Sequence, residues 1–273
     1  MYLPSLAHAF FWLLAISTRA YVCPFLGGAV IDVDQVEGTG NGASQPAIRT
    51  VSAEWNVPWT KANPHADLKD SGNRHSLAQW VGILGNMCDN SSWYPFLQAG
   101  TATQIDENGA TTVNAWVEWF PAGAHVIPEQ NMTVSPGDQM RVEVNVYTHI
   151  TGHVSMKNLR TGQEYEADVK ADSPEDPRFQ ICLGYGTAQF FQEWVIANDR
   201  GDLPVFNNIT FTNVQARDRR GKAFDFSTGR KDYWNMTTDV GEHVAIPHEI
   251  DSKTFVIYSP KGGDWGPPER ACS

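Results

Sequence analysis

Positive charge is scarce in this sequence of 273 residues. Lysine and arginine together number 20, against 31 aspartates and glutamates, so the formal net charge is −11. Nucleic acid binding depends on a basic surface that neutralises phosphates, and the sequence shows no cluster of basic residues that would form one. The charge balance therefore argues against nucleic acid as a partner.

Hydrophobic runs long enough to cross a membrane are absent. The apolar run from Leu6 to Ile16 is shorter than the roughly 20 residues that span a bilayer. Ser17-Thr18-Arg19-Ala20 follows it, with small residues where a signal peptidase requires them. We expect residues 1–20 to be a secretory signal peptide, and the mature protein to be secreted with no membrane attachment after cleavage.

Cysteine is also rare, with four in the chain, and no Cys-x-x-Cys spacing supports a zinc site. Secretion implies an oxidising compartment, in which cysteines form disulfides. Four cysteines allow three pairings, which the residues alone leave open. The cysteines are Cys23, Cys88, Cys182 and Cys272.

Asn-x-Ser/Thr sequons accompany this secretory signal. They are acceptor sites for surface glycosylation in a secreted protein, so we expect a glycoprotein. The acceptor asparagines are Asn90, Asn131, Asn208 and Asn235.

No long stretch has the 3.6-residue period of an amphipathic helix. Instead, Val142, Val144 and Val146 alternate with polar residues, which is typical of a half-buried strand. Similar short runs, separated by Gly, Pro, Asn and Asp, predict an all-β antiparallel sandwich or barrel that forms one domain over residues 21–273. The predicted strands are 29–33, 50–57, 79–83, 112–120, 193–196, 209–214 and 254–258.

Several common catalytic motifs are missing. There is no Gly-x-Ser-x-Gly elbow of a serine hydrolase and no Glu-x-Asp-x-Glu arrangement of a lectin-like glycosidase. The pairs His149 with His153 and His243 with His248 each flank a turn, but two histidines without a third ligand make a poor metal site. We therefore expect neither a metal nor a cofactor.

Four segments match the motifs of a known family in the same order. They are Gln79–Ile83, the stretch from Phe96 to Thr101 that contains Gln98, Ala115–Pro121 and Glu193–Asn198. In this order they resemble the glutamic peptidases (eqolisins), which are secreted fungal acid endopeptidases. The resemblance extends over nearly the whole mature chain and implies a lectin-like (concanavalin A-like) sandwich of two seven-stranded sheets, which we expect to be monomeric. Residues 59–76 and the extra residues between Cys182 and Glu193 look like insertions, and we place both in loops.

The family resemblance also implies the catalytic residues. In eqolisins a glutamate acts as general base on a water, while a glutamine positions the water and hydrogen-bonds the oxyanion. Gln98 matches the glutamine. The glutamate comes four residues after the acidic residue of an Ala-Glu-Trp-Ile-Val-Glu type strand, a place that Ala197 occupies here. Since a methyl group cannot take a proton, this reading predicts a catalytically impaired peptidase with a vacant dyad position.

Another carboxylate could replace the missing base, which would keep the protein an acid endopeptidase. At about 3.3 Å per residue, Glu193 is about 13 Å from the place of Ala197, which is too far, and Asp199 is about 6.6 Å away. Glu118 is the strongest candidate, because eqolisins have a glutamate beside the glutamine, although its role could be only to support Gln98. Leu84 and Asn114 stand where family members have acidic residues.

Tryptophans in the matched motifs offer a binding surface. We expect Trp80 and Trp116 to line a substrate-binding cleft, with Trp119 and Trp194 packing in the core. An aromatic cleft binds apolar peptide side chains or sugar rings. A third possibility is therefore a non-catalytic module that binds peptides or cell-wall glycans.

The resemblance finally implies a disulfide pairing. Eqolisins place one cysteine just after the Trp-Val-Gly-Ile strand and another shortly before the catalytic strand, which favours Cys88 with Cys182. Cys23 then pairs with Cys272.

Overall fold

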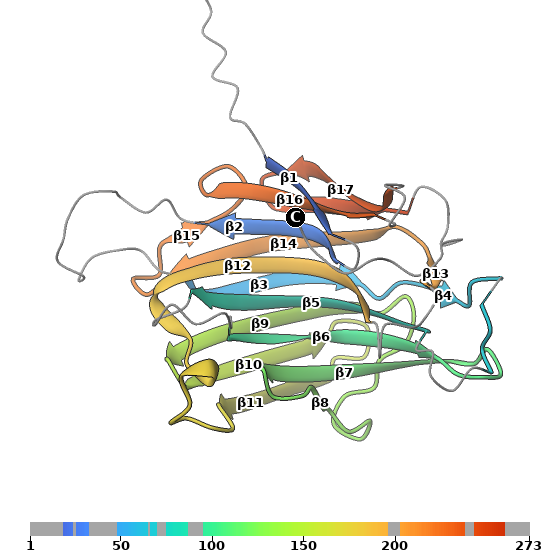
Figure 1. Ribbon diagram of the computed structural model, residues 1–273, viewed down its shortest axis with the longest axis horizontal. Coiled ribbons are helices and arrows are strands. Elements are labelled where there is room, and N and C mark those ends of the chain that lie inside the picture. The colour runs from blue at the N-terminus through green and yellow to red at the C-terminus, as the bar shows by residue number, and fades with distance from the viewer. Residues whose placement is uncertain are drawn as a thin grey trace, which may run out of the picture.

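The computed structural model describes residues 19–23, 26–32, 48–64, 66–69, 75–86, 95–195, 203–237 and 243–259. For residues 19–23, 86, 182–186, 194 and 195 it describes the backbone alone. Figure 1 shows two layers of strands that overlie each other. The predicted all-β class is confirmed, since one short 3-10 helix, η1 (Pro177–Phe179), accompanies the strands in the described part of the chain. No helix in these residues is long and apolar enough to cross a membrane.

The front sheet contains the strands that match the family motifs. Its order is β16-β2-β12-β5-β6-β7-β8, with β1 parallel to β16. The bounds are β1 (Arg19–Cys23), β2 (Leu26–Asp32), β5 (His75–Asn86), β6 (Phe96–Ile105), β7 (Thr111–Phe120), β8 (His125–Val126), β12 (Cys182–Val195) and β16 (Arg230–Thr237). The expected cleavage point after Ala20 falls within β1.

The back sheet has the order β11-β10-β9-β3-β14-β18-β17. Strand β17 also pairs with β16, so the two sheets are continuous through it. The bounds are β3 (Ile48–Asn56), β9 (Gln139–Thr148), β10 (Thr151–Asn158), β11 (Glu164–Lys170), β14 (Ile209–Asp218), β17 (His243–Asp251) and β18 (Thr254–Tyr258). Three two-residue strands complete the fold: β4 (Thr60–Lys61) pairs with β13 (Val205–Phe206), and β15 (Ala223–Phe224) pairs with β14.

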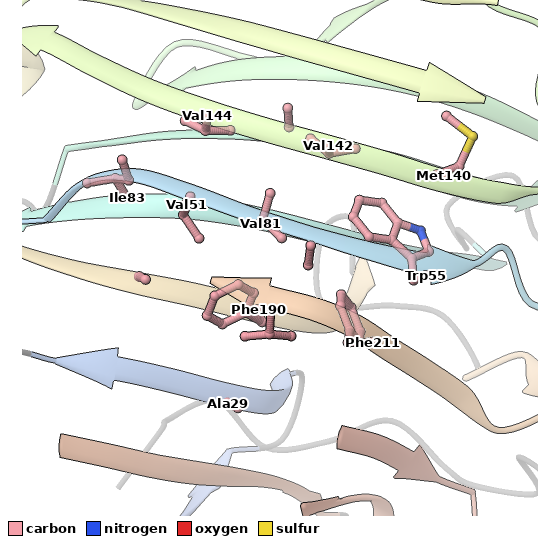
Figure 2. Close-up of a cluster of buried hydrophobic side chains, with 14 of the residues drawn as sticks. Ala29, Val51, Trp55, Val81, Ile83, Met140, Val142, Val144, Phe190 and Phe211 are labelled. Atoms are coloured by element: carbon pink, nitrogen blue, oxygen red, sulfur yellow. The ribbon is translucent and has the colours of Figure 1, made fainter. Parts of the chain in front are cut away.

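Alternating side chains build the core between the sheets. On β9, Val142, Val144 and Val146 are buried while the residues between them face outward, as the period of two predicted. Figure 2 shows side chains from both sheets, among them Phe190 of β12 and Phe211 of β14, converging on this core. The rings of Phe211 and Phe255 stack with centroids 4.9 Å apart. This packing fixes the inner face of the front sheet, so its other face is available for a site.

Neither stretch assigned to a loop is wholly a loop. Residues 59–76 include β4 and the first two residues of β5, and the residues between Cys182 and Glu193 belong to β12. The prediction for the second stretch, which rested on its glycines, is wrong. Phe190 points into the core, and from Ala188 onward the strand pairs with β2 on one side and β5 on the other. An irregularity between Cys182 and Gly186 absorbs the extra residues at the start of the strand.

Candidate active site

Gln98 lies on the outer face of the front sheet, in a register that brings the matched motifs together. It pairs with Gly82 of β5 on one side and with Glu118 of β7 on the other. Two residues further along β6, Gly100 pairs with Trp80 of β5 on one side and with Trp116 of β7 on the other. Because side chains two residues apart share a face, Gln98, Glu118, Trp80 and Trp116 all point the same way.

These side chains line a cavity of about 850 Å³ on that face. Trp80 and Trp116 are both buried in its wall. Trp119 packs in the core, and its indole N–H donates to the carbonyl of Phe179 at 2.8 Å. Leu84 and Asn114, the two neutral replacements, also line the cavity. Among the described residues that form the lining, the ionisable ones are Glu118 and Glu193.

Gln98 is fixed by one of these carboxylates. Its Nε2 donates a hydrogen bond to Oε2 of Glu118, and its Oε1 is buried with no partner among the described residues. Burial raises the pKa of Glu118 above its ordinary value, and the hydrogen bond from Gln98 lowers it in part. A buried carbonyl oxygen without a protein partner is suited to accept a hydrogen bond from water or substrate.

Glu193 is the second carboxylate of the cavity, and the reasoning from sequence missed it. It lies on β12, opposite Ala78 of β5, and its Oε2 accepts a hydrogen bond from Trp80 Nε1 at 2.9 Å. Burial raises its pKa to about 7; the bond from Trp80 acts against this, and the charge of Glu118 adds to it. A carboxyl group with a pKa near neutrality can exchange a proton under mild conditions. The sequence prediction considers only the distance of Glu193 from the place of Ala197. In the structure, the neighbours of Glu193 that matter are Trp80 and the hydrogen-bonded pair of Gln98 and Glu118.

Several predicted sites lie outside the described residues or at their edge. Ala197, Asp199, Asn90, Cys88 and Cys272 are not described. The backbone of Cys182 pairs with Asn86, two residues before Cys88 in the sequence. Of the remaining sequon asparagines, Asn131 and Asn208 are exposed and Asn235 is partly buried on β16.

Comparison with known proteins gives consistent matches. The family model described as "Peptidase A4 family" matches residues 36–259. Aspergillopepsin-2 from Aspergillus niger is 29% identical over 153 residues, which are 54% of this chain and 48% of that protein. Scytalidopepsin B from Scytalidium lignicola is 30% identical over 124 residues, which are 45% of this chain and 40% of that protein. The matches thus span about half the length of these curated relatives, or less.

Solved structures show the same fold. Scytalido-glutamic peptidase with a transition state analog inhibitor superposes with a TM-score of 0.62 at 19% identity, covering 87% of this chain and 98% of that one. Aspergilloglutamic peptidase from Aspergillus niger superposes with a TM-score of 0.54 at 24% identity, covering 68% of this chain and 99% of that one. At these identities the likeness concerns the fold.

Proposed function

Because this chain belongs to the peptidase A4 family, that of the glutamic peptidases, we propose that it hydrolyses peptide bonds in this cavity, with Gln98 and Glu193 as the reacting pair. The observation that carries the proposal is that Glu193, a carboxyl group with a pKa of about 7, shares the cavity with a buried carboxamide oxygen that has no protein partner. Proteins and peptides are therefore the proposed substrates.

Glu193 has the chemistry of the general base. In its ionised form it takes a proton from a water, whose oxygen attacks the carbonyl carbon of the peptide bond. The proton then passes to the leaving nitrogen as the carbon–nitrogen bond breaks. The indole of Trp80, which donates to Glu193, holds the carboxylate in place.

Gln98 complements this base. Its Nε2 has two hydrogens, and Glu118 accepts one of them. The other can stabilise the oxyanion, while Oε1 can accept a hydrogen bond from the attacking water. Glu118 is then a positioning residue rather than the base, because its carboxylate is already engaged in orienting Gln98.

The Ala-Glu-Trp-Ile-Val-Glu type motif can be aligned with the sequence of β12 in a second way, and this alignment agrees with these roles. Since the extra residues lie at the start of the strand, Ala188 through Glu193 can be aligned with the Ala-Glu-Trp-Ile-Val-Glu type motif, and Glu193 then occupies its last place. In this register an alanine at 197 no longer removes the base. The expectation of a vacant dyad position came from aligning the motif four residues further along.

A catalytically impaired protein that binds peptides, or glycans, is the second candidate. It is supported by the mainly apolar lining of the cavity and by the neutral side chains of Leu84 and Asn114. Under this alternative, Ala197 is the vacant position. A recruited base, Glu118 or Asp199, would instead keep the protein an acid endopeptidase.

Cleavage of a denatured protein substrate across pH 3 to 8 separates the candidates. We expect turnover by the wild-type protein, and a loss of about 10²-fold or more in both Glu193→Gln and Gln98→Ala. Glu166→Gln, an exposed glutamate on β11, is the matched control and should keep full activity. An inactive wild-type protein that gains activity in Ala197→Glu would instead establish the vacant position.

The remaining proposals concern the environment of the protein. We propose that it is secreted after removal of residues 1–20, as a disulfide-bonded monomer. The pairing of Cys182 with Asn86 supports the Cys88–Cys182 bridge. The exposed positions of Asn131 and Asn208 support glycosylation there.

A further inference from the structure

Three apolar side chains form one end of the cavity. Leu84 of β5 pairs with Phe96 of β6, and Phe96 pairs with Phe120 of β7, so the three lie side by side across the sheet. Each is two residues from the row of Gly82, Gln98 and Glu118 and therefore points into the same cavity. We call this set of Leu84, Phe96 and Phe120 the apolar row.

The aromatic rings of the apolar row pack against each other and are partly exposed. Phe96 and Phe120 stack with centroids 4.9 Å apart, and Phe96 also lies 6.1 Å from the ring of Trp80. All three members of the row remain partly exposed. The row thus offers a preformed surface that a substrate side chain can cover without rearranging it.

The opposite end of the cavity has a different chemistry. Beyond Trp80 the floor consists of Ala78 and Ala102, followed by Ser76 and Gln104, with Asn114 beside them. These side chains are small or polar, and across β12 the row that contains Ala78 continues to Glu193 and then to Leu26, the one large apolar residue in it. The two ends of the cavity therefore favour different substrate side chains.

We propose that the apolar row is the specificity pocket, and that it selects substrates with a large apolar residue, aromatic or leucine-like, beside the bond to be cleaved. This inference rests on the proposed peptidase function. Two residues along a strand correspond to about 6.6 Å, which is also the spacing of side chains on one face of an extended peptide. With the reacting carbonyl at Gln98, a neighbouring substrate side chain reaches the row.

Leu84 is the member of the row whose replacement by a carboxylate would change the charge of the pocket. None of the three side chains is ionisable, and the two ionisable groups of the described lining lie outside the row. A lysine or aspartate of the substrate would lose its hydration against Leu84, and Glu118, the carboxylate in the adjacent row, is already bonded to Gln98. A carboxylate in place of Leu84 would supply that partner for lysine.

Peptides that differ at one residue test the pocket. The probe is an equimolar set in which one central position is Phe, Leu, Ala, Lys or Asp, with cleavage followed by mass spectrometry. We expect the wild-type protein to cleave the Phe and Leu peptides with at least about tenfold higher kcat/KM than the Lys and Asp peptides. In Leu84→Asp the Lys peptide should gain at least about tenfold relative to the Phe peptide.

Val126→Asp is the matched control, since Val126 also lines the cavity but is paired with Trp116, away from the row, and is 52% exposed. It should leave the Phe to Lys ratio unchanged. Cleavage without side-chain preference, or an equal change of the ratio in both variants, overturns the pocket while leaving the peptidase function intact. If the wild-type protein cleaves no peptide, the proposed peptidase function fails. Calorimetry with the Phe and Lys peptides then tests the pocket by itself. Equal affinities overturn the pocket, and tighter binding of the Phe peptide supports it.

Discussion

At the scale of single residues, the cavity places two carboxyl groups in different settings. Glu118 accepts a hydrogen bond from the Gln98 amide, while Glu193 accepts one from the Trp80 indole. Burial raises the pKa of both, and the charge of Glu118 raises that of Glu193 further. The ionisation of Glu118 therefore affects the pKa of Glu193, so the pH dependence of stability and of activity both report on the site.

The first prediction concerns stability against pH. The pKa of Glu193 is about 7 in the folded state, against 4.5 ordinarily, so the folded protein holds this proton more tightly than the unfolded chain. Protonation stabilises the fold fully below about pH 4.5, and this stabilisation is lost as the pH rises to about 7. The loss is at most about 3 kcal/mol. Thermal unfolding should therefore show that Glu193→Gln has a higher Tm than wild type at pH 8 and a similar one at pH 4.

Glu166→Gln again serves as the control, because the side chain of Glu166 is exposed and lies on the back sheet, away from the cavity. Its Tm should follow that of the wild-type protein across the whole pH range. If Glu193→Gln retains the wild-type pH dependence, the carboxyl group of Glu193 is not the one that holds the proton.

The second prediction concerns activity against pH. A general base acts when ionised, so kcat/KM should rise with pH toward the pKa of Glu193, about 7. Glu118→Gln removes a like charge, so the rising limb should move to lower pH. The maximal rate should fall as well, since Gln98 loses the carboxylate that orients it. A profile that falls over this pH range would instead mean that Glu193 reacts in its protonated form.

At this scale the sequence indicates four residues that the structure brings together in one cavity. Gln98, Glu118, Trp80 and Trp116 each lie in a local motif with a clear strand parity, which predicts a shared face. The sequence prediction excludes Glu193 as the base because of its distance along the strand from the place of Ala197. Residue spacing within one segment cannot show that the pairing of β12 with β5 brings Glu193 to Trp80. The apolar row was missed for the same reason, since its members come from three strands.

At the scale of elements, the expected strands were found, with β18 matching its predicted bounds and β12 running far longer than predicted. The residues from Ala188 to Glu193 form a central strand because they pair with β2 on one side and with β5 on the other. Glycine content alone had suggested a loop there. Tertiary pairing outweighs such local preference in a strand that is covered on both edges.

The third prediction concerns the close approach of β5 to β6. A Cβ atom added to Gly82 would lie 2.9 Å from Cβ of Gln98 and 3.0 Å from the carbonyl oxygen of Leu97, so Gly82→Ala must displace β6. Misplacing a catalytic group by about 1 Å can cost about 10²-fold in rate. We expect kcat/KM for peptide cleavage to fall by about that factor. Gly123→Ala, where nothing lies within 4 Å, is the control and should leave the rate unchanged.

Circular dichroism and thermal unfolding of both glycine variants would show whether the fold survives. A folded Gly82→Ala protein with normal kcat/KM would show that the geometry of Gln98 is not critical. This result would count against the proposed pair.

At the scale of the whole molecule, strand β17 joins the two sheets along one side of the sandwich. The family resemblance implies a sandwich of two sheets, whereas the structure joins them into one continuous sheet. The difference has a simple cause: β17 pairs with β16 near its start and with β18 over the rest of its length. Such a shared strand cannot be predicted from hydrophobic pattern, because both partners present the same alternation.

The fourth prediction is the pairing of the cysteines. We expect Cys88 to pair with Cys182, and Cys23 with Cys272. Peptide mapping of the secreted protein without reduction should recover both bridges. A fragment that joins Cys23 to Cys88 would contradict the placement of β12 against β5.

The position of β2 determines when the cavity can exist during synthesis. Strand β2, near the N-terminus, pairs with β12 and with β16, so it has neither neighbour until most of the chain has left the ribosome. Trp234 of β16 is itself part of the cavity lining. A nascent chain that ends before β16 therefore has no finished cleft. Pairing across such long sequence separations is slow, so we expect the cavity to be among the last parts of the molecule to form.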